Sequence, residues 1–474
     1  MSSDWETVIG LEVHCELRTV TKLFCGCRSA FGDEPNTNIC PVCLGLPGSL
    51  PVLNRQAVEL AMRIGAALHC EVRGSIFHRK NYFYPDMPKD YQISQYDEPL
   101  NVNGSLELPD GTRIGIERAH MEEDTGKTTH VGTSGRIHGA DFSLVDYNRA
   151  GVPLVEIVSR PDIRGAEQAR TYVSELRAIL VATGASDGKM EEGSLRVDAN
   201  VSVHHPDEAF GTRCEIKNLN SLRSLGRAID YEVRRQISVL EDGGRVVQET
   251  RHWNEDEGRT SSMRSKEEAY DYRYFPEPDL VPIDPPETWK AAVRESLPVL
   301  PAQRRRELAA RAGMAPADVA LLVELDLDAL VTSAVALGAD PRIAVNRAAN
   351  EVAAALGSAP SLDPAAFATV CRMEAEGRLT ATQAKAVLGE LLVSGGDPVA
   401  IADARGFAPV DSGLVEAAVD DAIGADAAAW ARYVAGEDKV AGMFVGKVMK
   451  ATGGKADGGT VTAILQRKRS AAQA

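Results

Sequence analysis

The sequence lacks any run of about 18 consecutive apolar residues, which a membrane-spanning helix would need. Residues 1–5 show neither the basic and apolar segments of a secretory signal nor the Arg-rich amphipathic pattern of an organelle-targeting peptide. Long internal repeats and low-complexity tracts are missing as well. These absences predict a cytoplasmic protein that is not anchored to a membrane.

Several signature motifs of nucleotide-binding and acyl-transfer enzymes are also absent. The sequence has no Walker A motif, no glycine-rich dinucleotide fingerprint, no protein-kinase signature set and no Gly-x-Ser-x-Gly nucleophile elbow. Four isolated cysteines stay open as nucleophiles, namely Cys15, Cys70, Cys214 and Cys371. Any ATP would therefore bind on an open sheet with metal and basic loops rather than in a phosphate loop.

The charge is acidic and unevenly distributed. A net charge of -16 argues against indiscriminate binding of nucleic acid, because attraction to phosphates depends on positive surface. From Lys439 to the end, seven Lys and Arg stand against one acid, Asp457, which gives +6 and leaves -22 for the rest. We therefore expect a phosphate-binding role at the C-terminal end.

A chain of 474 residues with 44% hydrophobic content is too long for one core and predicts two to four domains. Over residues 8–285, period-two alternation with frequent Gly and Pro predicts a large, mostly antiparallel sheet. Helical periodicity over 168–182 and 222–240 predicts helices on its apolar side. At 285–300 the composition becomes Ala-rich and helical, and a second break at 406–412 precedes a small helical module. The expected class is α+β.

Two kinds of local signal fix individual elements. In the strand predicted over 8–17, Leu11 and Val13 share one face while Glu12 and His14 share the other. Further strands are predicted over 194–203 and 213–217, with polar faces that carry Arg196, Asp198, Asn200, Arg213, Glu215 and Lys217. In the helical region, starts are predicted at Asp363 before Pro364 and at Thr380 with Gln383, and an end at Gly395.

Four cysteines form two close pairs, Cys25 with Cys27 and Cys40 with Cys43. In a large cytoplasmic chain, such clustering favours metal over disulfides. Two thiolate pairs on two turns make a tetrahedral zinc site, and four thiolates leave no open position for water. We therefore predict a structural zinc ion; a partly filled or degenerate site is the alternative.

Acidic side chains gather in a few segments. Glu12 and His14 share a strand face, Glu122, Glu123 and Asp124 form an acidic run, and Asp198 follows the acidic pair 191–192. Phosphoryl transfer needs divalent metal held by carboxylates, which these residues could supply. The alternatives are a solvated acidic turn for the run and a structural histidine for His14.

The stretch 78–92 mixes cations, aromatics and prolines without a helical or strand period, and predicts a shaped loop. Arg79, Lys80 and Lys89 could neutralise phosphates there, while tyrosines such as Tyr82 and Tyr84 could wall a pocket or stack on a base. Segment 271–279 has the same character. The alternative is a rigid structural loop that only supports a site.

Taken together, seven motifs closely resemble the GatB family of the heterotrimeric amidotransferase GatCAB. They include Val-Ile-Gly-Leu-Glu-Val-His at 8–14, Arg-Lys-Asn-Tyr-Phe-Tyr-Pro-Asp at 79–86, His-Met-Glu-Glu-Asp-Thr-Gly-Lys at 120–127 and Lys-Met-Glu-Glu-Gly-Ser-Leu-Arg at 189–196, with the segments 91–95, 215–220 and 271–279. The resemblance implies a cradle of glutamine synthetase-like fold, a helical domain and a YqeY-like tail. We place these domains at 1–294, 295–406 and 407–474.

The resemblance also implies an activity. Members of this family act as ATP-dependent carbon–nitrogen ligases: Mg-ATP phosphorylates the side-chain carboxylate of Glu-tRNA(Gln), Asp-tRNA(Asn) or both. Ammonia from the partner GatA then displaces the phosphate, and GatC holds the two large subunits together. Two alternatives stay open, a non-catalytic zinc-containing tRNA-binding scaffold and a free-standing ligase for a small amino acid.

Residue by residue, the resemblance places the magnesium ligands among Glu12, His14, Glu122, Glu123 and Asp124. The residues that we predict to be catalytic are Glu12, His14, Glu123, Asp198 and Lys80. Predicted substrate-binding residues are Arg79, Tyr82, Tyr84, Lys89, Arg196, Lys217, Lys447 and Lys450. Segment 436–450 resembles the module that grips the tRNA body, and the four-residue spacing of Gly442 and Gly446 favours close helix packing.

Overall fold

The computed structural model describes residues 4–132, 140–263, 272–356, 362–407, 412–452, 456 and 458–473. The chain divides into two compact units, Met1–Gln303 and Arg304–Ala474. Three separate hydrophobic clusters occur, one in the first unit and two in the second. The domain limits at 294 and 406 stay predictions.

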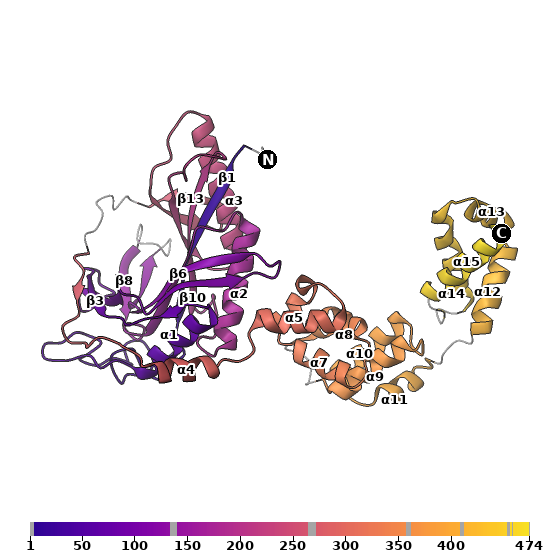
Figure 1. The fold of residues 1–474 in the computed structure, drawn as a ribbon, viewed down its shortest axis with the longest axis horizontal. Coiled ribbons are helices and arrows are strands. Elements are labelled where there is room, and N and C mark those ends of the chain that lie inside the picture. Colours follow the sequence, from indigo (N-terminus) through magenta and orange to yellow (C-terminus); the bar gives the residue numbers. More distant parts are fainter. Residues whose placement is uncertain are drawn as a thin grey trace. The chain divides into compact units, whose positions relative to one another are not determined.

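The first unit is built on a twelve-stranded sheet (Figure 1). Its main path runs β13-β12-β11-β10-β1-β9-β6-β4-β3-β14, while β5 pairs with β6 and with β2. Among the described strands, β11 and β12 pair in parallel and the other pairs are antiparallel. The sheet is therefore mixed, and the α+β class is confirmed. The strands are β1 (Glu6–Glu16), β2 (Glu71–Val72), β3 (Phe77–Asn81), β4 (Tyr91–Gln95), β5 (Asn101–Glu107), β6 (Arg113–Glu123), β9 (Pro153–Ser159), β10 (Leu195–His204), β11 (Cys214–Leu219), β12 (Thr250–Asn254), β13 (Arg259–Ser262) and β14 (Phe275–Pro276).

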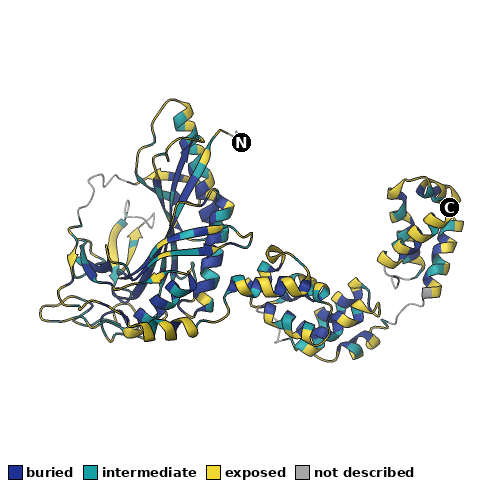
Figure 2. Ribbon diagram, viewed as in Figure 1, coloured by how far each residue is buried: buried dark blue, intermediate teal, exposed yellow. Residues whose placement is uncertain are grey.

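The two faces of the sheet differ in polarity because the side chains alternate. On β1, Leu11, Val13 and Cys15 are fully buried, whereas Glu12 and His14 on the opposite face are partly exposed. Against the apolar face pack α2 (Ala166–Ala182) and α3 (Leu222–Glu241), as predicted (Figures 1 and 2). The polar face carries the side chains of the candidate site.

Shorter elements complete the first unit. The helix α1 (Arg55–Ala67) begins at Asn54, whose side chain accepts hydrogen bonds from the backbone of Gln56 and Ala57, and α4 (Glu287–Glu295) packs against it. A separate two-stranded ladder joins β7 (Lys127–Gly132) to β8 (Ala140–Asp146).

Segment 78–92 differs from the predicted loop. Its two ends belong to β3 and β4, which pair with each other from Phe77 opposite Gln95 to Asn81 opposite Tyr91, and only residues 82–90 form the connection. The sequence hides these strands because their remaining neighbours, β6 and β14, come from distant parts of the chain. The conformation of this segment therefore rests on the pairing of β3 with β4 and on partners elsewhere in the chain.

The second unit is helical. Asp363 caps α9 and Thr380 forms a capping box with Gln383 at the start of α10, which ends at Gly395; all three predictions are confirmed. The helices are α5 (Pro301–Ala312), which begins in the first unit, α6 (Ala320–Glu324), α7 (Asp328–Ala336), α8 (Pro341–Arg347), α9 (Pro364–Ala375), α10 (Ala381–Ser394), α11 (Pro398–Ala404), α12 (Ser412–Gly424), α13 (Ala427–Val434), α14 (Ala441–Ala451) and α15 (Gly458–Gln473). Short 3-10 or π turns lie at Pro316–Val319, Ala348–Val352, Ala353–Ala355 and Asp438–Val440.

Candidate functional site

Strand register places a row of polar side chains across the sheet. Glu156 of β9 is the centre of this row: it lies opposite His120 of β6 on one side and opposite His14 of β1 on the other. His14 in turn lies opposite Arg196 of β10. Two residues back along β1, Glu12 lies opposite Asp198. Because directly opposed residues project from the same face of a sheet, the structure brings these side chains together from four strands.

The most compact group in this row is formed by His14, Glu122 and Glu156. His14 Nε2 lies 3.9 Å from Glu122 Oε1 and 3.7 Å from Glu156 Oε2. One ligand atom from each residue falls within 4.8 Å of the others. Two carboxylates and an imidazole at this spacing could hold a divalent cation.

Burial controls the protonation of this group. Burial lowers the pKa of His14 to about 4, so the imidazole is neutral and able to donate a lone pair. Burial and then the neighbouring charge of Glu156 raise the pKa of Glu122 to about 8. A buried carboxylate of this kind is costly to ionise without a counter-ion. This is the behaviour expected of an acidic group that binds a cation.

Sequence reasoning missed Glu156. Its strand, β9, is otherwise apolar and largely buried, so no acidic run marks it. The available signal was the reverse one, a single carboxylate inside the sequence Pro-Leu-Val-Glu-Ile-Val-Ser. A charged residue within a buried strand is rare unless it is paired or binds an ion.

A second acidic group adjoins the first and contains Glu12, Asp198 and Glu215. Lys217 Nζ lies 2.7 Å from Asp198 Oδ2 and 2.8 Å from Glu215 Oε1, and Asn200 donates to Glu12 Oε1 at 3.0 Å. Burial and the charges of Glu156 and Glu215 raise the pKa of Glu12. Glu12 therefore interacts with acids of both groups, and the ammonium of Lys217 neutralises part of the second one.

Asp124 is committed to arginines. Arg196 Nη2 lies 2.7 Å from its Oδ2 and Arg149 Nε lies 3.5 Å away. Burial alone would raise the pKa of Asp124, but these two cations outweigh it and lower that pKa. For nearby Glu16, burial and the charge of Asp124 raise the pKa to about 8. The structure thus places Asp124 with Arg196 rather than in the group of His14.

Glu123 lies apart from the other acids of its run. It follows Glu122 on the same strand, so its side chain projects from the opposite face. There it pairs with the ammonium of Lys89 and accepts from Ile93 N at 2.9 Å. Lys89 and Glu123 line a small cavity with Cys25 and Cys43. The predicted grouping of Glu123 with Glu12 and His14 is therefore not found in the structure.

Arg79 also has a different environment from the expected phosphate site. Its guanidinium makes a two-pronged ion pair with buried Glu277, at 2.7 and 2.9 Å, and lies over the ring of Tyr91. Glu277 comes from a segment nearly 200 residues away, which the sequence could not place. Arg79 thus links β3 to the segment that contains β14, and its guanidinium already donates to both carboxylate oxygens of Glu277.

Lys80, the next residue, faces the acidic row. Its charge acts on both Glu122 and His120, and its Nζ lies 4.8 Å from the centre of the Tyr272 ring. Tyr274 stacks on Tyr96 at 4.0 Å. After burial, the charge of Glu122 is the main cause that raises the pKa of Tyr274. A cation and an aromatic wall therefore border the carboxylates.

Tyr82 and Tyr84 stack on each other with ring centres 5.0 Å apart in the 82–90 connection. Burial and the charge of Asp86 raise the pKa of Tyr82 to about 12, with a smaller opposing effect from Lys217. Of the motif at 271–279, Asp271 lies outside the described residues.

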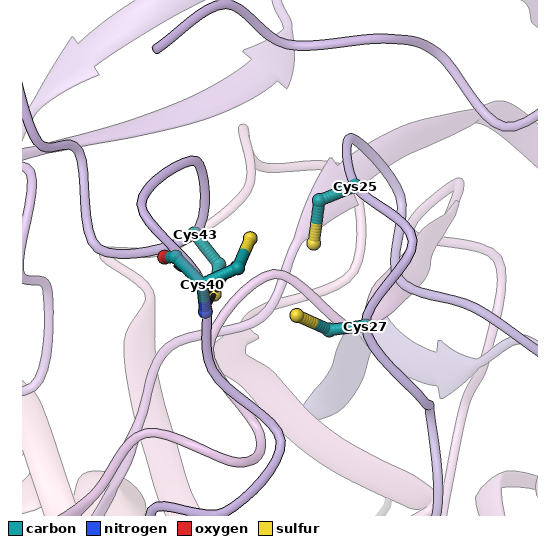
Figure 3. A group of neighbouring side chains, drawn as sticks. All are labelled: Cys25, Cys27, Cys40 and Cys43. Carbon is teal, nitrogen blue, oxygen red and sulfur yellow. Dashed lines mark hydrogen bonds between the residues drawn. The ribbon is translucent and has the colours of Figure 1, made fainter.

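The four cysteines converge as predicted. Figure 3 shows their side chains directed toward a common point, and their sulfur atoms lie within 4.8 Å of one another. Cys40 N donates to Cys43 Sγ at 3.1 Å, which is the kind of bond that holds a thiolate. Gly45, which follows the second pair, has φ +65°, and a side chain at this position would overlap Lys89. The cluster could hold a metal ion, and its all-sulfur donor set fits zinc.

The tail carries its predicted cations on the surface. Lys447 and Lys450 are exposed on α14, and Lys447 Nζ lies 2.8 Å from Asp426 Oδ2. Arg467, Lys468 and Arg469 also pair with acids of the tail. The cations of this module are thus partly balanced by acids that precede Lys439, so the +6 count applies only to its last part.

Gly442 and Gly446 do not mark close helix packing within the described residues. Both lie outside the buried set, and a side chain built at either one would meet no atom within 4 Å. The small residues therefore present bare backbone on one side of α14.

In the described part of the chain, no helix has the length and apolar character needed to cross a bilayer.

Comparison with known proteins assigns the family. Residues 7–291 match the family model described as "GatB/GatE catalytic domain", and residues 329–468 match the one described as "GatB domain". The chain is similar to proteins named as the B subunit of aspartyl/glutamyl-tRNA(Asn/Gln) amidotransferase. It is 51% identical to that of Salinispora arenicola, over 98% of this chain and 97% of the relative. For Frankia casuarinae the identity is 51% over 97% and 95%, and for Mycobacterium tuberculosis it is 49% over 97% and 94%. The chain therefore belongs to the GatB family, and the resemblance seen in its motifs is confirmed.

Proposed function

We propose that the chain is the B subunit of a tRNA-dependent amidotransferase. In this role it uses ATP to phosphorylate the side-chain carboxylate of Glu-tRNA(Gln), Asp-tRNA(Asn) or both, and ammonia then converts the acyl phosphate to the amide. The observation that carries the proposal is the row of carboxylates and imidazole on the polar face of the sheet, which supplies cation ligands without a phosphate loop.

The donor set fits magnesium. His14, Glu122 and Glu156 would hold the ion, with mostly oxygen ligands as Mg²⁺ prefers. Glu12 would add a further carboxylate close to this group. Bound magnesium would supply neutralisation of the phosphate oxygens and alignment of the transferred group. Glu123 and Asp124 are left out of this set because Lys89 and Arg196 pair with them, and Asp198 and Glu215 are left out because Lys217 does.

The remaining polar side chains of the face have distinct roles in this proposal. Lys80 and Lys217 offer ammonium groups close to the carboxylates, where they would stabilise charge that develops on phosphate. The rings of Tyr272 and Tyr274 border the same place and would exclude water or support a base. Arg196 would hold Asp124 and so fix the inner end of β6.

The cysteine cluster is proposed as a structural zinc site. Four thiolates complete a tetrahedral shell, so no position is left for substrate. The cluster lies beside Lys89 and Glu123, on the other side of β6 from the cation ligands. Zinc would therefore support the strand that carries Glu122 without contacting the reacting groups.

The proposal includes partners. The relatives are named as one lettered component of an amidotransferase, which implies further subunits, and we propose a GatA amidase as the ammonia source and GatC as the third member. The tail would contact tRNA through α14, where Lys447 and Lys450 are exposed. The assembly would act in the cytoplasm, where misacylated tRNA is made.

The decisive experiment uses the three-subunit complex with each misacylated tRNA. We expect ATP-dependent amide formation, with a phosphorylated aminoacyl-tRNA trapped when glutamine is withheld. Glu156→Gln should remove both products, whereas Glu117→Gln, an exposed change on the same β6 strand as Glu122, should leave them unchanged. Normal tRNA binding without any phosphorylated intermediate in the unaltered complex would instead identify a scaffold protein. ATP hydrolysis driven by free glutamate would identify a free-standing ligase.

A further inference from the structure

His120 is a buried histidine that the proposed reaction does not use directly. It lies on β6, is 5% exposed, and stands opposite Glu156 of β9 in the strand register. Its Nε2 lies 3.4 Å from Glu156 Oε2, and the same oxygen lies 3.7 Å from His14 Nε2. One carboxylate oxygen thus lies between two imidazoles, of which only His14 belongs to the candidate cation group.

The surroundings of His120 determine which ring nitrogen carries the proton. Its Nδ1 is buried without a hydrogen-bond partner. A proton on Nδ1 would leave a buried donor unpaired and would turn the Nε2 lone pair toward a carboxylate, and both cost free energy. The tautomer with the proton on Nε2 avoids both costs.

We propose that His120 is a positioning residue, whose Nε2–H is directed at Glu156 and holds that carboxylate in the orientation that binds the cation. The inference rests on the proposed function, because it needs a cation between His14, Glu122 and Glu156. A carboxylate offers about four lone pairs. With one of them taken by His120 on the strand side, the others are directed toward the open side of the sheet.

The distance of 3.4 Å is long for a hydrogen bond and short enough to close by a small rotation of the carboxylate. Contacts of this kind tighten when a catalytic site is filled. Second partners that orient metal ligands are known to change metal affinity by about 10- to 100-fold when they are removed. The same size of effect is expected here.

The test measures Mn²⁺ binding to the purified full-length chain by electron paramagnetic resonance, without ATP or tRNA. His120→Leu, which removes the donor, should weaken binding by about 10- to 100-fold. His120→Gln, which returns an N–H near the position of Nε2, should recover most of the affinity. His204→Leu removes another buried histidine at the far end of the sheet, opposite Glu6, and should leave Mn²⁺ binding unchanged.

In the assembled complex, His120→Leu should raise the Mg²⁺ concentration needed for half-maximal amide formation while leaving the rate at saturating Mg²⁺ nearly unchanged. A merely structural role would lower the rate at every Mg²⁺ concentration and would appear as a lower melting temperature. Equal Mn²⁺ affinity in His120→Leu and the unaltered chain, with Glu156→Gln weakened, would overturn the positioning role alone. Equal affinity in Glu156→Gln as well would overturn the cation site itself.

A spectroscopic reading separates orientation from packing. Long-range ¹H–¹⁵N spectra of histidine-labelled protein should show His120 as the neutral tautomer protonated at Nε2, assigned by its loss in His120→Gln. Its Nε2 resonance should move when a diamagnetic divalent cation is added. A tautomer protonated at Nδ1 would contradict the proposal, whatever the binding data show.

Discussion

The polar face of the sheet and the tail module use the same residue types in opposite ways. On the sheet, acids such as Glu122 and Asp124 are buried, and Asp124 is held by Arg196 at 2.7 Å. In the tail, charged side chains such as Lys447 and Lys450 project from a helix into solvent. Buried charges are screened little by salt, and exposed ones strongly. The difference accords with the proposal that the sheet performs the chemistry and that the tail attracts tRNA reversibly.

The sheet offers the most direct test of this contrast. Glu12→Gln combined with His14→Ala should lower amide formation by about 1000-fold or more, since neutralisation of the transferred phosphate is lost. Added salt should not restore the rate. The measurement is amide formation by the three-subunit complex on misacylated tRNA, with size-exclusion chromatography to check assembly. Activity within about tenfold of the unaltered complex would count against the site.

Variants of the cysteine cluster test whether a metal site on the other side of β6 affects amide formation only indirectly, by supporting the strand. Cys25→Ser with Cys43→Ser should abolish zinc binding and lower amide formation by about 10- to 100-fold, as expected of an effect transmitted through a supporting shell. Zinc content is measured by mass spectrometry, and Cys70→Ser, outside the cluster, serves as the matched control. An unchanged zinc content in the double variant would refute the assignment.

Removal of the tail tests the other half of the contrast. A chain that ends at Gly406 should bind tRNA about tenfold more weakly at physiological salt, with a flatter dependence of affinity on salt because fewer phosphates are contacted. Mn²⁺ binding by the same chain should not change, since its ligands lie on the sheet. Filter binding across a salt series provides the reading, and an identical salt slope would show that the tail does not contact the RNA.

The smallest expected effect concerns the bare backbone of α14. Gly442→Ala should stabilise the helix by about 0.5–1 kcal/mol, because glycine has the greater freedom in the unfolded chain and alanine meets no neighbour in the folded one. Thermal unfolding of the full chain measures this gain. If the glycine also allows close approach of RNA backbone, tRNA binding should fall while stability rises, whereas a parallel loss of both would contradict the open environment.

Much of the fold could be predicted because it depends on local patterns. The alternation in β1 determined which residues face the core, and short motifs determined the caps at Asp363 and Thr380. The two ends of segment 78–92 were misjudged for the converse reason. Their strand character depends on pairing with each other and with β6 and β14, and the pairing with distant segments leaves no mark on a short stretch of sequence.

The site was predictable in composition and not in grouping. Glu12, His14 and Glu122 were identified from clustering, yet neighbouring Glu123 belongs to the opposite face with Lys89. Glu156 was missed because strand register, not sequence proximity, brings it to His14. Arg79 carried the signal of a phosphate ligand, and its partner Glu277 could not be inferred from the residues around it.

Gly45 lies where the cysteine loop meets the ion pair of Lys89 with Glu123. It turns the loop just after the second cysteine pair, and Lys89, which grips Glu123, fills the space where any side chain would go. An engineer who transplanted another cysteine loop into this protein would therefore have to keep a residue without a Cβ here. With any other residue there, the new loop would still bind metal, but its Cβ would displace Lys89 from Glu123.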